Sequence, residues 1–420
     1  MKTNLIALLL AALAGTVSAE DATLYQIKNR WLKQCLADVS GAVVYQAPAG
    51  GPPPLVKRGT VSVIAPVAGA AVRGEVRIDI LAPGLGDAVV KCWQQGAGFG
   101  ADVTLGVVQL DADGKGVFVF PADQFPHGPL TVRVTGLGRA EINTYNLQLY
   151  NEGGVSWNEG APKEPPPPAA GMKLVYLDDF DAPLSISKTG ADAKYAAHKP
   201  GGGDFGKIPF SDFESEKNPF AQRDTYLRIR VDANKNSAGL LSSLRLDGTG
   251  FTASAPCYFE CRFIAQSAPT TWPAFWVMTR DTFKGLKEPA DELDIIEAYG
   301  GFGQGFPNQT GYWITSHRWN QDDGQKLPGV YQQVPMTTLG GGSGWWETFH
   351  IYGCKITATD TIYYFDNIEV GRHPTYPLSK TRPFFFFINH AFPGHGWPAD
   401  PSSHGGVYDL YVDYVRVWQE

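Results

Sequence analysis

The chain has 420 residues, a length that corresponds to two or three domains. Its 35 lysine and arginine residues are outnumbered by 42 aspartate and glutamate residues, and the net charge of −7 argues against a nucleic-acid-binding protein, which presents a basic face. With 48 glycines and 31 prolines the chain is rich in turns but below the level of a disordered protein, and no apolar run of about 20 residues that could span a membrane occurs after the N-terminus.

Residues 1–19 have the pattern of a secretory signal peptide. Lys2 supplies the positive end, residues 5–14 form the apolar stretch, and Val17-Ser18-Ala19 is a small-residue cleavage site. A membrane anchor would need a longer apolar run. We therefore expect a secreted protein, extracellular or periplasmic, whose mature chain begins near Glu20 and has no contact with a membrane after the signal is removed.

Residues 20–58 form a short N-terminal arm that ends in a stretch rich in proline and glycine. The next segment, residues 59–151, has short runs of strand-forming residues separated by turns. Val76, Ile78 and Ile80 alternate with polar residues, which is the period of a strand with one buried face. About 90 residues of this kind, without a cluster of reactive side chains, predict an immunoglobulin-like β-sandwich that serves as a spacer or a weak binding module.

Residues 152–172 are predicted to be a linker because they contain four consecutive prolines at 165–168. Proline-rich linkers are extended and semi-rigid, so we expect this one to hold the neighbouring domains apart. Residues 173–420 contain eight of the eleven tryptophans and show many short strands without helical periodicity of useful length. These strands are expected at residues 226–231, 258–265, 361–365, 384–388 and 412–417. The pattern predicts an all-β protein whose largest domain is a two-sheet sandwich.

The segment 291–297, Asp-Glu-Leu-Asp-Ile-Ile-Glu, carries the strongest chemical signal. On a regular strand Glu292 and Asp294 project from the same face, whereas Glu297 lies an odd number of positions from both and points to the other face. A β-bulge among the two isoleucines before Glu297 would return it to the face of the other acids. Three carboxylates in one patch cannot all ionise freely, so we expect at least one raised pKa.

A pair of carboxyl groups, one ionised and one protonated, is what glycoside hydrolysis requires. An acidic run can also be the solvated edge of a sheet. Two features favour the catalytic interpretation. The isoleucines indicate burial beside the acids, and the aromatic segment 272–276, Trp-Pro-Ala-Phe-Trp, precedes them and offers flat faces on which sugar rings stack. The residues by themselves therefore indicate a polysaccharide hydrolase.

At these positions the sequence resembles glycoside hydrolase family sixteen, of the laminarinase and β-glucanase type. Glu292, Asp294 and Glu297 match the bulged form of the family signature, Glu-x-Asp-x-x-Glu, and the segment 272–276 matches its aromatic strand. Phe386-Phe387-Ile388-Asn389 and residues 412–417 match later strands in the same order.

The resemblance covers residues 173–420 and implies a β-jelly roll with the cleft on its concave face and retaining, double-displacement chemistry. It implies that Glu292 is the nucleophile and Glu297 the acid/base. Asp294, between them, would hydrogen-bond Glu292 and tune its charge. The loop 196–206 is long enough to shape one end of the cleft.

The resemblance also suggests further site residues. It implies that no cofactor is required, although a structural calcium ion near Asp413 is suggested. His317 follows the catalytic strand, as a cleft-facing histidine does in many family members, and the other candidates are aromatic residues suited to stacking on sugars. The candidates for substrate binding are Trp272, Trp276, Tyr299, His317, Trp319 and Trp397.

We therefore expect a secreted, retaining endo-glycosidase whose partner is a β-linked polysaccharide, with β-1,3- or β-1,3/1,4-glucan as the first choice. A microbial exopolysaccharide or an agar-like galactan is the alternative substrate, and transglycosylation is the alternative outcome of the same chemistry. From another class, the chain could be a non-catalytic carbohydrate-binding protein. Such a protein would typically have lost an acid, and all three acids are present here.

Overall fold

The structure is a computed structural model, and it describes residues 36–39, 42–45, 61–93, 102–137, 143–155, 160–264, 271–299, 311–321, 327–339, 348–392 and 405–420. The chain divides into two compact units, Met1–Arg58 and Gly59–Glu420. The described part of the first unit is the antiparallel hairpin of β1 (Leu36–Val39) and β2 (Ala42–Tyr45). The predicted signal peptide lies outside the described residues.

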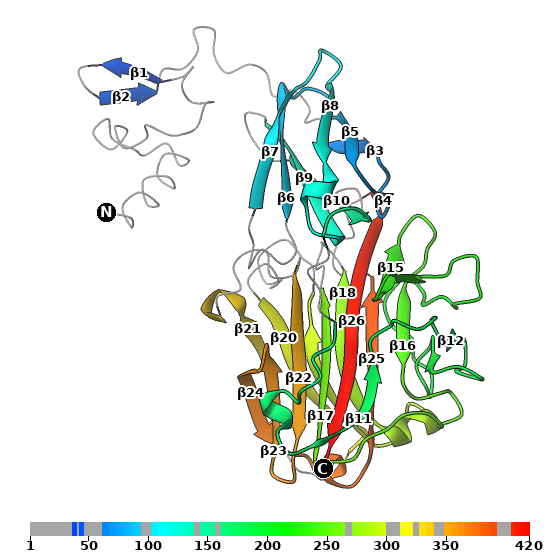
Figure 1. The fold of residues 1–420 in the computed structure, drawn as a ribbon. Coiled ribbons are helices and arrows are strands. Elements are labelled where there is room, and N and C mark those ends of the chain that lie inside the picture. The colour runs from blue at the N-terminus through cyan, green and yellow to red at the C-terminus, as the bar shows by residue number, and fades with distance from the viewer. Residues whose placement is uncertain are drawn as a thin grey trace. The chain divides into compact units, whose positions relative to one another are not determined.

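The second unit begins with a small β-domain made of two sheets (Figure 1). One sheet has the strand order β4-β10-β9-β6-β7 and the other has the order β3-β5-β8. The strands are β3 (Ser62–Ala65), β4 (Ala71–Val72), β5 (Glu75–Leu81), β6 (Asp87–Trp93), β7 (Asp102–Gln109), β8 (Lys115–Pro121), β9 (Gly128–Leu137) and β10 (Asn143–Asn151). Val76, Ile78 and Ile80 of β5 are buried in the core between the sheets, as their alternation predicts. The immunoglobulin-like identity of this domain stays a prediction.

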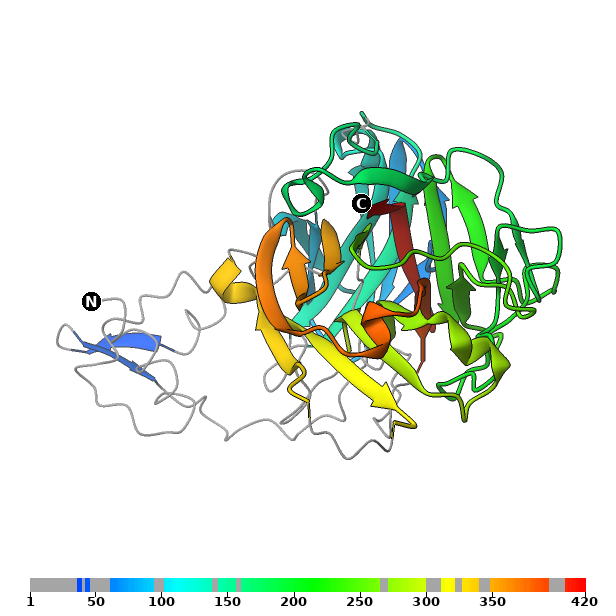
Figure 2. The same ribbon diagram turned by 90° about the horizontal axis from the view of Figure 1, so that it is seen from below.

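The rest of the unit consists of two large sheets that pack face to face. The first has the order β14-β15-β26-β17-β22-β23-β24, with β11 also paired to β26, and the second has the order β12-β13-β16-β25-β18-β19-β20-β21. The strand β26, red in Figure 2, lies between β15 and β17. The strands of the first sheet are β11 (Lys173–Asp178), β14 (Phe220–Arg223), β15 (Tyr226–Asp232), β17 (Cys257–Ile264), β22 (Phe349–Ile356), β23 (Asp360–Phe365), β24 (Ile368–Pro374) and β26 (Val407–Gln419).

The second sheet carries the acidic segment. Its strands are β12 (Ile186–Ser187), β13 (Tyr195–Ala196), β16 (Gly239–Ser242), β18 (Trp272–Thr279), β19 (Ala290–Glu297), β20 (Gly311–Trp319), β21 (Tyr331–Pro335) and β25 (Phe384–Ala391). The predicted all-β class and the jelly-roll sandwich are confirmed, and each of the five strands expected in this segment is present. The helices of the described residues are short 3-10 turns, and none is long and apolar enough to cross a membrane.

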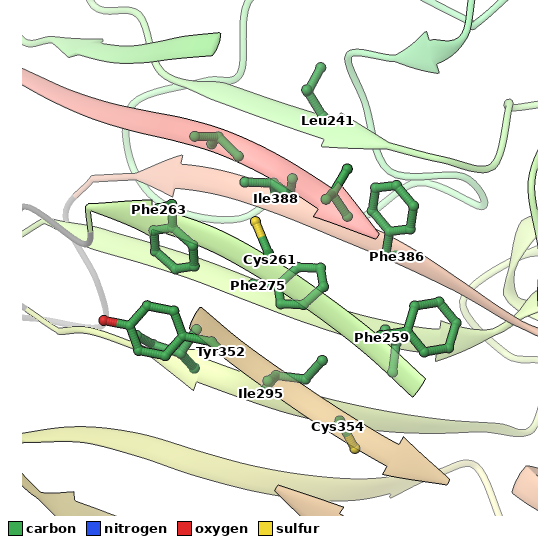
Figure 3. Packing of buried hydrophobic residues seen from close by; sticks show 14 of the residues in the cluster. Leu241, Phe259, Cys261, Phe263, Phe275, Ile295, Tyr352, Cys354, Phe386 and Ile388 are labelled. Atoms are coloured by element: carbon green, nitrogen blue, oxygen red, sulfur yellow. The ribbon is translucent and has the colours of Figure 1, made fainter. Parts of the chain in front are cut away.

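The main hydrophobic core fills the space between the two large sheets. Figure 3 shows Phe259 and Phe263 of β17 together with Phe275 of β18 and Ile295 of β19. All four side chains are almost completely buried. Burial of such a side chain contributes roughly 1.5–3 kcal/mol, so this core holds the sheet that carries the acids in a fixed position.

The last residues of the predicted linker pack on the first large sheet. Pro167–Ala169 form a 3-10 turn, and Ala169 and Met172 are buried against Tyr258 and Trp418. The linker with the bounds 152–172 stays a prediction, but its end next to the sandwich is not free, because Ala169 and Met172 bury their side chains on the sheet.

Direct hydrogen bonds also join the small domain to the sandwich. The Tyr150 hydroxyl donates to Asp224, and the Asp409 backbone N–H donates to Gln148 Oε1 at 2.9 Å. The Arg230 guanidinium also donates to the Gly69 carbonyl at 3.2 Å. The small domain and the sandwich are therefore docked on each other.

Candidate active site

A β-bulge in β19 places the three acids on one face. On one side Trp276 pairs with Asp294, whereas Phe275 pairs with Ile296, so Ile295 is the extra residue. The pairing of β19 with β20 shows the same shift between Asp294 and Glu297. Ile295 and Ile296 both enter the core, which is why the next side chain, Glu297, emerges beside the other acids. The bulge expected from the sequence is present.

The three acids line a cavity of about 450 Å³ on the face of the second sheet that points away from the core. Five of the six side chains predicted for substrate binding line it as well, and the sixth, Trp397, lies outside the described residues. The loop predicted to shape one end of the cleft also contributes to the wall. The lining residues used below are Lys199, Phe205, Trp272, Trp276, Glu292, Asp294, Glu297, Tyr299, Thr315, His317, Trp319 and Asn389.

Glu297 is held by three hydrogen-bond donors. Trp272 Nε1 donates to its Oε1 at 3.1 Å, and the Tyr299 hydroxyl donates to the same oxygen. Thr315 Oγ1 donates to Oε2 at 2.9 Å from the neighbouring strand β20. The Glu297 carboxyl is thus fixed at both oxygens, so it presents one orientation to the cavity.

Glu292 and Asp294 share a histidine. His317 Nε2 lies 3.4 Å from Asp294 Oδ2 and 4.0 Å from Glu292 Oε1. His317 reaches them from β20, where it is directly opposite Glu292 in the register. One donor atom from each of the three residues lies within 4.8 Å of the others, so this group is also the place among the described residues where three side chains could hold a cation.

The pKa of each of the three acids is raised. Burial raises the pKa of Glu292 to about 8, with a further rise from the charge of Asp294. Burial and the charge of Glu297 raise the pKa of Asp294 well above its usual range. Burial also raises the pKa of Glu297, although its hydrogen bonds from Tyr299 and Thr315 oppose this rise. The cluster therefore retains at least one proton near neutral pH, as expected from three neighbouring carboxylates.

Aromatic side chains form the walls beside the acids. Phe205 packs on Trp272 with 5.0 Å between ring centroids, and Trp272 also packs on Tyr299 at 5.2 Å. Trp319 is 45% exposed and stacks on His317 at 4.9 Å. A sugar ring presents an apolar face to such planes, so the exposed indole of Trp319 is well placed to contact one.

Trp276 has a more structural position than the other aromatic candidates. Its ring stacks on Phe387 with a centroid distance of 4.0 Å, and its Nε1 donates to Asn389 Oδ1 at 2.7 Å. The Asn389 amide in turn donates to the Trp272 carbonyl at 2.9 Å. Trp276 is only 5% exposed. It forms the floor of the cavity, where Phe387 and Asn389 hold its ring in place.

Sequence reasoning did not assign four of these residues to the site. Phe205 and Lys199 lie in the loop expected at the cleft end, but nothing in the sequence indicates which of its side chains face the acids. Asn389 closes the family motif 386–389, and Thr315 is two positions before His317 on the same strand. Period-two spacing from His317 is the signal that places Thr315 on the cavity face.

Asp413 was suggested as a calcium ligand. Its carboxylate is buried and accepts a hydrogen bond from the Arg262 guanidinium, so its charge is balanced by a cation of the protein itself. Burial raises the pKa of Asp181, and the charges of Asp179 and Asp413 raise it further, so these two acids lie near Asp181. The described residues around Asp413 contain no cluster of three ligating side chains. Calcium binding here stays a prediction, and no step of the chemistry depends on it.

Known proteins that resemble this chain are of the same kind as the family suggested by the sequence motifs. No family model matches the chain. The chain is 28% identical over 208 residues to the endo-1,3-1,4-β-glycanase EglC of Rhizobium meliloti, covering 48% of this chain and 40% of EglC. It is 22% identical over 288 residues to the glucan endo-1,3-β-glucosidase A1 of Niallia circulans, covering 62% of this chain and 39% of that protein.

The chain thus spans about 40% of the length of the curated relatives it matches. Among solved structures, LamA from Z. galactanivorans in complex with laminaritriose and laminaritetraose matches at 18% identity with a TM-score of 0.45, covering 59% of this chain and 99% of that chain. The resemblance to β-glucan-cleaving glycoside hydrolases, expected from the motifs in residues 173–420, is confirmed by the sequence similarity to the curated relatives.

Proposed function

We propose that this chain is a retaining endo-glycosidase that hydrolyses a β-linked polysaccharide, with a β-1,3- or β-1,3/1,4-glucan as substrate. The observation that carries the proposal is the bulge of β19, which gathers Glu292, Asp294 and Glu297 at one cavity lined by aromatic rings. The substrate class rests on the relatives, one named an endo-1,3-1,4-β-glycanase and the other a glucan endo-1,3-β-glucosidase.

The chemistry follows from two carboxyl groups with different surroundings. The Glu292 carboxylate attacks the anomeric carbon, and the bond from that carbon to the bridging oxygen breaks while Glu297 gives this oxygen its proton. Water then adds to the anomeric carbon as the ester bond to Glu292 breaks, and its proton passes to Glu297. If a sugar hydroxyl replaces water in the second step, the same site performs transglycosylation.

The surroundings support these roles. Trp272, Tyr299 and Thr315 fix the orientation of Glu297, which must face the bridging oxygen in both steps. Asp294 lies between the two glutamates and, with His317, controls how much negative charge Glu292 carries. Trp319 and Phe205 provide the apolar planes against which neighbouring sugar rings can pack.

The cellular location and the accessory parts belong to the same proposal. The predicted signal peptide at residues 1–19 supports secretion to the medium or the periplasm, where a polymer too large to enter the cell is accessible. All the described residues that line the cavity belong to residues 173–420 and none to the small β-domain, so we assign the reaction to residues 173–420.

The test is an incubation of the purified protein with laminarin, barley β-glucan, agarose, xyloglucan and a succinylated exopolysaccharide, with reducing ends counted over time. Glu292→Gln, which preserves the shape of the side chain, is the matched blank. Release from a β-glucan that is absent in the blank supports the proposal, and proton NMR of the first product must show the β-anomer. Binding to a glucan without release of reducing ends from any polymer would instead favour a carbohydrate-binding protein.

A further inference from the structure

Lys199 brings a positive charge to the cavity, and the reaction proposed above gives this residue no role. Among the described residues that line it, Lys199 is the only lysine or arginine. Its Nζ lies 5.7 Å from the centroid of the Trp276 ring. It forms no ion pair with a carboxylate of the described residues, so its charge is directed to the cavity and not cancelled by a single partner.

Lys199 lines the same cavity as the three acids, and the Trp276 ring over which its charge lies is a neighbour of two of them. Trp276 is directly opposite Asp294 in the register of β18 and β19, and Met278, two positions along, is opposite Glu292. Directly opposed side chains lie about 4.5–5.5 Å apart at their Cβ atoms, and diagonal neighbours about 7–8 Å apart. The Lys199 charge lowers the pKa of Glu292 and of Asp294, in each case against the larger effect of burial.

The loop that carries Lys199 is held in place by a histidine clamp. His198 Nδ1 lies 2.7 Å from Asp204 Oδ2, and His198 Nε2 lies 2.6 Å from Asp212 Oδ1. Asp204 also accepts a hydrogen bond from the Lys199 backbone N–H at 3.4 Å. The residue before Lys199 and its own backbone are thus tied to the same carboxylate.

Close backbone packing fixes the other end of the loop. Gly201 has a φ of +81°, and a Cβ at this position would lie 2.0 Å from the Thr282 carbonyl oxygen. The loop therefore approaches the segment after β18 more closely than any residue with a side chain would allow. Phe205, at the far side of the loop, packs on Trp272 and Trp276. The close packing at Gly201 and the aromatic contacts of Phe205 therefore hold Lys199 in a fixed position in the cavity wall.

The three acids differ in what stabilises their charge. Glu297 has three hydrogen-bond donors, whereas the Glu292 carboxyl accepts no hydrogen bond from the described residues and has His317 Nε2 at 4.0 Å. Without another influence, hydrogen bonding would favour the charged form of Glu297 and leave the proton on the Glu292 and Asp294 pair. The proposed reaction needs the opposite arrangement, with a charged Glu292 and a protonated Glu297.

We propose that Lys199 is a positioning residue that corrects this arrangement: its ammonium group, held above Trp276 by the loop 198–206, favours negative charge on Glu292 and Asp294 and so leaves the proton of the cluster on Glu297. This inference rests on the proposed glycosidase function for its purpose. The distribution of the proton is a property of the folded protein and can be measured without any substrate.

The first experiment is a carbon-13 NMR titration of the glutamate carboxyl groups in the full chain, with Glu292 and Glu297 signals assigned from Glu292→Gln and Glu297→Gln. Lys199→Met removes the charge and keeps most of the apolar stem, Lys199→Arg keeps the charge, and Lys207→Met removes a charge from an exposed position of the same segment. In Lys199→Met the apparent pKa of Glu292 should rise by roughly half to one unit, the size expected for a charge several ångströms away across a partly solvated cavity. Lys199→Arg and Lys207→Met should stay within about 0.2 unit of the parent.

The second experiment measures kcat/KM against pH on the polymer that the parent protein cleaves. The acid limb of Lys199→Met should move to higher pH by the same roughly half to one unit, because more of its Glu292 is protonated. Unmoved carboxyl titrations in Lys199→Met, or a Lys199→Arg variant that behaves like Lys199→Met, would overturn the inference. So would a loss confined to carboxylated glucans with an unchanged pH profile on neutral glucan, since Lys199 would then read charge on the substrate. If the parent cleaves no polymer, the proposed function fails, while the titration still decides the role of Lys199.

Discussion

Removing the hydroxyl of Thr315 tests the proposed acid/base role of Glu297. Thr315→Val removes the 2.9 Å hydrogen bond to Glu297 Oε2 and replaces the hydroxyl with a methyl group of similar size. Thr315 is 2% exposed, so water does not take the place of the lost donor. A hydrogen bond to a charged group contributes about 1.5–3 kcal/mol, and 1.36 kcal/mol corresponds to one pKa unit, so the pKa of Glu297 should rise by about one to two units.

The sign of the kinetic effect follows from the role of Glu297. Glu297 must carry its proton in the first step, so the alkaline limb of kcat/KM reports the loss of that proton in the free enzyme. A higher pKa moves this limb to higher pH by about one to two units, and the apparent value belongs to the coupled cluster.

The assay is kcat/KM on the cleaved glucan from pH 4 to pH 10. Thr361→Val is the matched control, because Thr361 is also buried and its hydroxyl bonds Thr375 at 3.2 Å, away from the cavity. An alkaline limb that does not move in Thr315→Val, or moves to lower pH, would refute the assignment of Glu297 as a carboxyl stabilised by this donor.

Three further predictions concern sugar stacking, a buried ion pair and the histidine clamp. Trp319→Ala should raise KM about two- to tenfold, because an aromatic contact contributes about 0.5–1.5 kcal/mol to binding. Thermal stability should change little, because the indole is exposed. An unchanged KM on every glucan would show that Trp319 does not contact the substrate. Arg416→Met should lower the free energy of unfolding in urea by about 3–5 kcal/mol, because it leaves the fully buried Glu260 without its cation. Arg372→Met, at an exposed pair, should hardly change it, and equal losses in the two variants would contradict the burial argument. The hydrogen bonds that His198 donates to Asp204, and then to Asp212, raise the pKa of His198 against the effect of burial, and Lys188 is the nearby cation, 3.5 Å from Asp212. The stability that His198 contributes is therefore present below its unfolded pKa of about 6.5 and is lost as the pH rises through the raised pKa of the folded protein. His198→Asn should lower the urea midpoint of unfolding at pH 5.5 and hardly change it at pH 9. A larger loss at pH 9 than at pH 5.5 would contradict the histidine clamp.

The fold and the acids were predictable because their patterns are local. Alternation with period two indicates the strand of Val76, Ile78 and Ile80, and parity alone shows that Glu297 needs a bulge to join Glu292. Parity does not say which isoleucine is the extra residue. That choice, Ile295, depends on how β18 pairs with β19.

Other parts of the site depend on contacts between distant segments. Lys199 comes to the acids from almost a hundred positions earlier in the chain, through a loop whose path is set by Gly201 and the His198 clamp. The docking of the linker depends on the surface that Tyr258 and Trp418 offer to Met172. Proline content predicts an extended backbone, but it does not predict which neighbouring side chains are buried, so the packing of Met172 could not be read from the sequence.

Trapping of the covalent intermediate identifies the nucleophile without assuming which carboxyl group it is. The protein is incubated with a 2-deoxy-2-fluoro-β-laminaribioside that carries a good leaving group, digested with pepsin, and the fragments are weighed by mass spectrometry. We expect one added fluoro-disaccharide on the Glu292 carboxyl and none in Glu292→Gln. A label on Glu297 or Asp294, or rapid cleavage of β-glucan by Glu292→Gln, would contradict it.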